Sequence, residues 1–237
     1  MAYLRGLEER KEEVIRLIDE QGKLTEELKA EIMKAEVLQR VEDLYKPYKQ
    51  KKATRASKAR EKGLEPLAFT FLEQKLTEGD LKELAAEFVD AEKGVETPED
   101  AIQGAMDIIA EMISDDAEII DIIREKTAAH GMIKTEATDP EAKSVYEMYY
   151  DSSEPVSKMP NHRVLAINRG EKEEFIKVKV ETDTESMERA IADKVITNSD
   201  SIFTEILNET IADSYKRLIA PSVERETRNA LTERAEA

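Results

Sequence analysis

The spacing of apolar residues is the strongest constraint on the fold of this chain. They recur every three or four positions along most of its 237 residues, as on the buried face of a helix. Examples are Leu7, Val14 and Ile18 near the start, and Ile102, Ile109 and Ile113 near the middle. Only EFIKVKVE, residues 174–181, alternates apolar and charged residues as a strand does. We therefore predict a mainly α protein, a multi-helix assembly of helical hairpins with one small β element near residues 174–181.

Helix starts are marked by side chains that can accept a hydrogen bond from the first free backbone N–H groups. The residues in such positions are Thr25, Asp80, Thr97, Ser114, Asp139 and Ser199. Pro98 strengthens the start at Thr97, because proline suits the first helical turn. Residues 152–160 contain two prolines and are expected to form a loop.

The strand at residues 174–181 needs a partner, because a lone strand leaves its backbone hydrogen-bonding groups unpaired. Residues 132–136 are the best candidate within the chain. The sequence pattern also changes after Gly131, and we predict a soft domain boundary there. Residues 1–131 would form a helical domain that carries a basic segment, and residues 132–237 a helical region with the short β element.

Composition excludes several classes of function. The chain has no cysteine, so it has no disulfide, thiolate metal site or cysteine nucleophile. Its first residues, MAYLRGLEERKEE, lack the apolar region of a signal peptide, and no apolar run reaches the roughly 18–20 residues of a membrane span. We expect a cytoplasmic protein without a membrane partner. A formal charge of −17 argues against general binding to nucleic acid.

The concentrated positive charge of the chain lies in residues 46–62, which hold eight basic residues and one acid, Glu61. Without this segment the formal charge would be −24 instead of −17. Exposed charges are screened over about 8–10 Å at physiological salt, so the segment acts locally. The candidate nucleic-acid-binding residues are Lys46, Lys49, Lys51, Lys52, Arg55, Lys58, Arg60 and Lys62.

Two interpretations of this basic segment remain open. Its side chains could contact phosphates and release counterions, with Tyr45 and Tyr48 stacking on bases. Alternatively, the segment could pair with acidic groups of this protein or contact other domains. The sequence alone does not decide between them.

The remaining candidate chemistry is weak. His130 and His162 are the only histidines and lie far apart in the sequence, so a structural role is favoured over a metal site. Arg163 and Arg169 could hold a phosphate near a helix end, but a packed turn is the simpler interpretation. Asp115 and Asp116 are expected in the first turn of a helix, where its dipole stabilises acids. No nucleophile motif, Walker loop or dinucleotide fingerprint is present, so we expect no catalytic residue, metal or cofactor.

Five stretches of the chain together resemble one known family. They are VEDLYKPYKQKK, AREKGLEPLA, GAMDIIAEMISDDA, MPNHRVLAINRGE and DSYKRLIAPSVERE, in this order from Val41 to Glu226. The set resembles the Tex family of bacterial transcription accessory proteins, over the whole chain. The resemblance implies an internal piece of a longer protein, beginning after the family's first helices and ending before its RNase H-like (YqgF) domain. Helix-hairpin-helix and OB-fold RNA-binding domains would follow further on.

The resemblance implies a non-enzymatic helical scaffold that supports nucleic-acid binding and transcription regulation by the full-length protein. Nucleic acid would bind weakly here or through the absent domains, and transcription machinery is a possible partner. Two alternatives are a nuclease fragment that acts through carboxylates, and a purely protein-binding helical module. The oligomeric state is left open.

Overall fold

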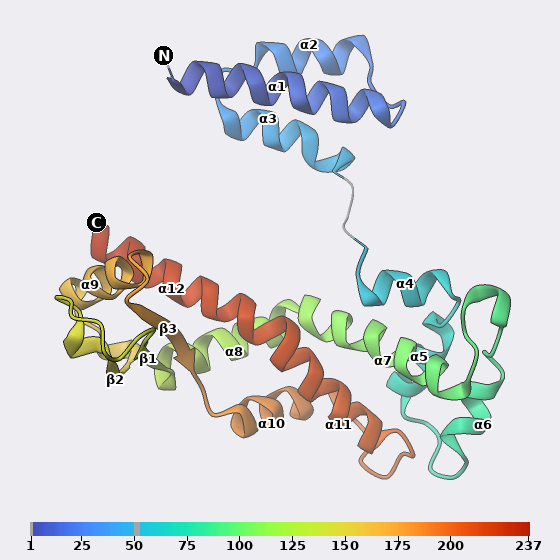
Figure 1. Cartoon of the computed structure of the whole chain (residues 1–237). Coiled ribbons are helices and arrows are strands. Elements are labelled where there is room, and N and C mark those ends of the chain that lie inside the picture. The colour runs from blue at the N-terminus through green and yellow to red at the C-terminus, as the bar shows by residue number, and fades with distance from the viewer. Residues whose placement is uncertain (1, 50–52) are drawn as a thin grey trace. The chain divides into compact units, whose positions relative to one another are not determined.

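The computed structural model describes residues 2–49 and 53–237. The chain forms two compact units, Met1–Ala53 (unit 1) and Thr54–Ala237 (unit 2). Both units are built mainly from helices, and unit 2 also holds a small antiparallel sheet (Figure 1). The predicted fold class is therefore confirmed. In the part of the chain that the structure describes, no helix combines the length and apolar character needed to cross a bilayer.

Unit 1 contains three helices that pack on one another, α1 (Ala2–Glu20), α2 (Glu26–Lys34) and α3 (Leu38–Tyr45). The apolar stripe predicted from the sequence faces inward, and Val14 and Ile18 are fully buried. Gly22 lies in the turn that follows α1 and has a φ of 69°, a conformation that favours glycine. Thr25 caps α2 as predicted, because its hydroxyl accepts a hydrogen bond from the Leu28 N–H at 3.1 Å.

Polar groups also hold unit 1 together. Arg10 of α1 donates to the carboxylate of Glu42 on α3, with Nε 2.6 Å from Oε1. Its guanidinium also lies over the ring of Tyr45, 5.5 Å from the ring centroid. The buried amine of Lys11 donates to the Met33 carbonyl at 3.0 Å and to Glu8 at 3.3 Å. These contacts join the three helices through a few charged side chains.

Unit 2 contains nine further α-helices and three strands within the described residues. In chain order they are α4 (Arg55–Glu61), α5 (Glu65–Glu73), α6 (Leu81–Ala86), α7 (Pro98–Asp115), α8 (Ala117–His130), β1 (Met132–Ala137), β2 (Asp151–Pro155), α9 (Asn161–Lys172), β3 (Ile176–Glu181), α10 (Thr184–Val195), α11 (Thr204–Asp213) and α12 (Ala220–Glu236). Helix α7 packs against α4, α5, α6 and α11, whereas α8 packs mainly on α10 and α12. The antiparallel pairing of α7 with α8 that a short turn favours is therefore not their main packing.

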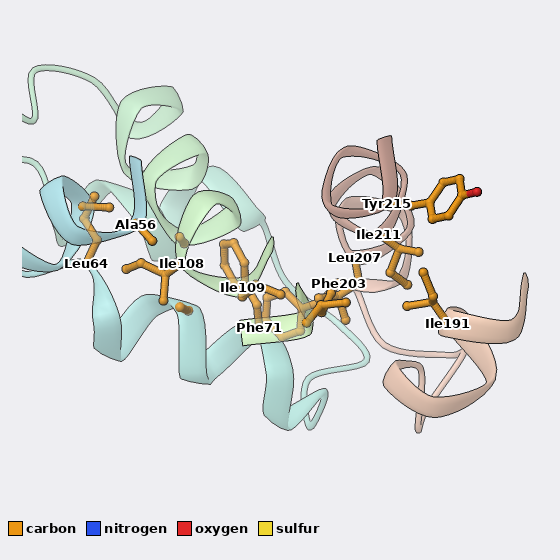
Figure 2. Packing of buried hydrophobic residues seen from close by; sticks show 14 of the residues in the cluster. Ala56, Leu64, Phe71, Ile108, Ile109, Ile191, Phe203, Leu207, Ile211 and Tyr215 are labelled. Atoms are coloured by element: carbon orange, nitrogen blue, oxygen red, sulfur yellow. The ribbon is translucent and has the colours of Figure 1, made fainter. Parts of the chain in front are cut away.

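The larger core of unit 2 lies among helices. Figure 2 shows its side chains extending from Ala56 and Leu64 through Ile109 to Ile191 and Tyr215. Phe71 and Phe203 are fully buried, and their rings stack with centroids 5.1 Å apart. This core joins residues from both sides of Gly131, so the two compact units do not divide there. The predicted division into domains at Gly131 stays a prediction.

The sheet has the strand order β2-β1-β3, and both pairings are antiparallel. The predicted strand and its predicted partner are confirmed, since Ile133 lies opposite Val180. The loop predicted for residues 152–160 is partly wrong, because residues 151–155 form β2. A smaller core lies among the sheet, α9 and α12, with Ile133, Ile167 and Ile176 buried.

Several predicted helix starts are shifted. Thr97 and Asp80 cap α7 and α6 as expected. The start predicted at Ser114 is wrong, because α7 continues to Asp115 and Asp116 caps α8. Asp139 starts only a turn, and the helix expected at Ser199 begins at Thr204.

The junction between α11 and α12 is a π-helical segment, Ser214–Ile219. Pro221 follows it in the first turn of α12. Proline lacks an N–H group and its ring crowds the preceding turn, so a wider turn lets the helix continue. The buried hydroxyl of Ser214 donates to the Ala110 carbonyl at 2.7 Å and fixes this junction to α7.

Candidate functional site

The described part of the basic segment in unit 2 lies on α4, and its position follows from local sequence. Thr54 and Ser57 form a reciprocal cap, because each side chain accepts a hydrogen bond from the other's backbone N–H. Ala59 is buried where α4 meets α7. A Cβ on Gly104 of α7 would lie 2.2 Å from Leu64 Cδ1 and 3.3 Å from Ala59 Cβ, so glycine permits this close approach.

Arg55, Lys58 and Lys62 share one face of α4, since they are spaced by three and four residues. All three are exposed, and none forms an ion pair with another described residue. Arg60 differs, because its guanidinium lies 3.1 Å from the carboxylate of Glu111 on α7. Different residues of this one short helix therefore fit different interpretations of the basic segment. Arg60 pairs with protein acid, while the other three cations remain available.

The three available cations line an open groove of about 380 Å³ between α4 and α7. Asp100, Gln103 and Asp107 of α7 line the same groove and share a face of that helix. Asp107 accepts a hydrogen bond from Gln103 at 2.9 Å, and Asp100 accepts one from the Glu96 N–H at 3.3 Å. The groove therefore has one positive wall and one negative wall. An extended polyanion fits the α4 wall but meets repulsion from α7.

Lys93 is a further basic residue at this site, and the sequence analysis missed it. A Cβ on Gly63 would lie 3.5 Å from Lys93 Nζ, and one on Gly94 would lie 3.5 Å from Lys62 Cε. The turn after α4 and the turn of residues 91–94 are thus neighbours, each with a lysine beside the other's glycine. The paired glycine turns are the only sequence signal, and they do not reveal that the two turns meet.

The rest of the basic segment is not placed on this surface. Lys46 and Lys49 are exposed in unit 1, whereas α4 belongs to unit 2. Lys51 and Lys52 lie outside the described residues. Tyr45, one of the two rings that could stack on bases, is buried with the Arg10 guanidinium over it. Nucleic-acid binding by these residues stays a prediction.

The other candidate residues lie at helix ends or form ion pairs. His130 is the last residue of α8, where a cation suits the helix dipole, and His162 is exposed at the start of α9. Arg163 forms an ion pair with Glu154. Asp116 caps α8 by accepting hydrogen bonds from Glu118 and Ile119 N–H groups, which explains this acid without catalysis. Across residues 2–49 and 53–237, no three His, Asp or Glu side chains gather as metal ligands.

Fold and site together define a mainly helical region that carries a basic surface helix on an acidic body. Residues 77–237 match the family model described as Tex central region-like. The chain is 32% identical over 100% of its length to the transcriptional accessory protein Tex of Neisseria gonorrhoeae, of which it covers 32%. It is 49% identical over 99% of its length to the uncharacterized protein YdcI of Bacillus subtilis (strain 168), of which it covers 33%. The chain therefore belongs to the Tex family.

A human relative is similar over nearly the same range. S1 RNA-binding domain-containing protein 1 of Homo sapiens is 30% identical over 98% of this chain, which covers 24% of that protein. The chain thus spans 24% to 33% of the length of these relatives. The family resemblance drawn from the sequence motifs is confirmed.

Proposed function

We propose that this chain is a non-enzymatic helical scaffold of a Tex-like transcription accessory protein, and that α4 gives it a weak contact with nucleic-acid phosphates. The observation that carries the contact is the exposed row of Arg55, Lys58 and Lys62, which no described carboxylate neutralises through an ion pair. The names of two relatives, a transcriptional accessory protein and an S1 RNA-binding domain-containing protein, support a role in transcription and nucleic-acid binding. Regulation of transcription would belong to the full-length protein.

The negative wall of the groove sets the expected strength of this contact. Asp100 and Asp107 lie across from the cations and repel phosphate, and the whole chain carries a formal charge of −17. We therefore expect affinities no tighter than about 10⁻⁴ M at physiological salt, the weak end of non-specific binding. Binding should not depend on base sequence, because the proposed contacts of Arg55, Lys58 and Lys62 are with phosphates, which are the same at every nucleotide.

Fluorescence anisotropy with labelled single- and double-stranded DNA and RNA tests the contact. A triple variant, Arg55→Glu with Lys58→Glu and Lys62→Glu, should abolish binding and flatten its salt dependence. Each lost phosphate contact lowers the log–log salt slope by about 0.7–0.9. The matched control is Lys172→Glu with Lys177→Glu and Lys179→Glu, because these lysines are exposed in the same unit and also form no ion pair within the described chain. Equal binding by both variants would show that α4 is not the contact.

A second pair of substitutions tests the role of the negative wall. Asp100→Asn with Asp107→Asn preserves the hydrogen-bond acceptors of α7 and removes two negative charges from the groove. Nucleic-acid binding should become several-fold tighter if phosphates lie along α4. Unchanged binding would place the nucleic acid elsewhere on the molecule.

A purely protein-binding module is the second candidate function. The mixed charge of the groove favours it, because a protein segment can present acids to α4 and bases to α7 at once. Under this alternative the purified chain would bind no nucleic acid even at low salt. The same anisotropy series therefore separates the two functions.

A further inference from the structure

A second groove in unit 2 differs from the first because its lining is mainly apolar. It lies between α8 and α12, beside the turn Val156–Lys158, and has a volume of about 520 Å³. Ala128 of α8 and Ala230 of α12 line it and are exposed. Val156 and Leu231 also line it and belong to the smaller core. The small side chains of these two alanines leave this groove open, and we call it the apolar channel; it reaches the smaller core at Val156 and Leu231.

Two arginines lie along this apolar channel, and their partners differ. Arg124 is compensated, because it donates to Glu226 at 2.7 Å and to Asp121 at 2.6 Å. The Glu226 carboxylate accordingly raises the pKa of Arg124. Arg234 instead donates to two uncharged acceptors, the side-chain oxygen of Asn161 at 2.9 Å and the Met159 carbonyl.

Arg234 is therefore a positioned cation without a bound carboxylate. It forms no ion pair with any residue of the described ranges, although its acidic neighbour Glu233 is next to it in sequence. Two hydrogen bonds hold its guanidinium at the channel, so less side-chain freedom is lost when it binds an anion. Lys158 is exposed in the adjacent turn and precedes Met159, whose carbonyl accepts a hydrogen bond from Arg234.

We propose that this channel docks an amphipathic helical segment of a partner protein, with apolar residues over Ala128 and Ala230 and an acidic residue at Arg234. The channel runs along α12 from Glu226 to Arg234, about 12 Å at the helical rise of about 1.5 Å per residue, which fits two turns of a helix. An apolar channel between two helices accepts a third helix by interlocking side-chain ridges. The charge complementarity with Arg234 fixes the direction of the segment.

Selection from a displayed library of amphipathic helical peptides tests the proposal without a known partner. The whole chain is the target, and an Ala230→Leu variant, which fills the channel, removes peptides that bind elsewhere. We expect enriched peptides with apolar residues spaced by three or four positions and a glutamate or aspartate at one end. Failure to enrich any peptide, or enrichment without an acidic residue, overturns the proposal.

Calorimetry on one enriched peptide then locates its two contacts. Ala230→Leu should weaken binding about tenfold, an effect of about 1.4 kcal/mol. Asn229→Leu is the matched control, because it adds the same side chain at the neighbouring exposed position of α12, outside the channel. The control should bind as the unsubstituted chain does, and equal loss in both variants would contradict the assignment.

A double-mutant cycle isolates the charge contact. Arg234→Gln should weaken the acidic peptide about fivefold, in the upper range for an exposed ion pair, and should leave a peptide with Glu→Gln unchanged. Equal losses with both peptides would mean that Arg234 acts only on the shape of the channel, which overturns the charge part of the proposal. Sedimentation of the chain without peptide tests whether a second copy of the chain occupies the channel. A dimer of the chain that Ala230→Leu abolishes would assign the channel to a second copy and overturn the partner segment.

Discussion

The two units of this chain reach stability by different means. Unit 1 is a bundle of three helices with a small core, and charged side chains such as Arg10, Glu42 and Lys11 join its elements. Unit 2 has two separate hydrophobic clusters, and aromatic and isoleucine side chains contribute much of the larger one. Small domains bury a smaller fraction of their surface, so each buried side chain counts for more in unit 1. Similar core substitutions should therefore have unequal consequences in the two units.

The largest expected effect is the loss of the aromatic contact in unit 2. Phe203→Ala should lower the free energy of unfolding of unit 2 by about 3–5 kcal/mol, because it leaves a cavity beside Phe71 in a fully buried core. Methyl NMR of isoleucines during urea titration reports on each unit separately. Phe69→Ala is the control, since Phe69 is 44% exposed on the same helix as Phe71 and its loss should change little.

The same measurement also tests whether the two units unfold independently. If Phe203→Ala lowers the urea midpoint of Ile18 in unit 1 as much as that of Ile109 in unit 2, the two units unfold together. Separate midpoints would support independent folding of the units. A separate transition of the sheet region within unit 2 would support the boundary predicted at Gly131.

The matching substitution in unit 1 should lower the free energy of unfolding by less than Phe203→Ala does in unit 2. It should nevertheless be enough to unfold unit 1. Ile18→Ala removes a fully buried side chain from α1, and such changes cost about 2–5 kcal/mol. Because the core of unit 1 is small, we expect this loss to unfold unit 1 at room temperature while unit 2 keeps its urea midpoint. Leu4→Ala on the same helix is the control, with 60% of the residue exposed. A folded unit 1 in the Ile18→Ala chain would contradict the contrast between the units.

Sequence reasoning predicted the fold best where local rules decide it. The caps at Thr25, Asp80 and Thr97 were right, because a capping side chain contacts backbone only two or three residues away. Strand β2 was missed, because Ser152 and Ser153 are polar and the pairing with β1 is a long-range contact. No apolar alternation marks such a strand.

The candidate site was predictable only in part, for the same physical reason. The charges on α4 are a local property, and Arg55 and Lys58 could be named as candidates from the sequence of the basic segment alone. The ion pair of Arg60 with Glu111 and the neighbouring position of Lys93 depend on tertiary packing across many residues. A charge pattern thus shows which residues can bind a phosphate, while packing determines which of them remain available.

A smaller effect should follow from a polar contact inside unit 2. The buried side chain of Gln74 donates to the Val195 carbonyl at 2.9 Å and accepts from the Thr197 and Asn198 N–H groups at 3.0 and 3.2 Å. Gln74→Ala leaves these backbone groups without partners, which should cost about 2 kcal/mol. The NMR urea midpoints of unit 2 should fall and those of unit 1 should not. Gln39→Ala is the control, because Gln39 is exposed and its loss should have little effect in either unit.

The smallest expected effect is a pH dependence that acts on unit 2 and arises from Tyr215. Burial raises the pKa of Tyr215, and the nearby carboxylates of Glu188 and Glu224 act in the same direction, while the hydrogen bond with Thr182 opposes them. Above about pH 10 the unfolded chain releases this proton and the folded chain retains it, so stability falls as pH rises. Tyr215→Phe should cost about 0.5–1.5 kcal/mol at neutral pH through the lost hydrogen bond, and should flatten the alkaline decline. Urea titrations of unit 2 at neutral and alkaline pH measure both the loss of stability at neutral pH and the alkaline decline. An alkaline decline of the same size in the Tyr215→Phe chain would show that another group drives it, and a decline shared by unit 1 would again mean that the two units respond as one.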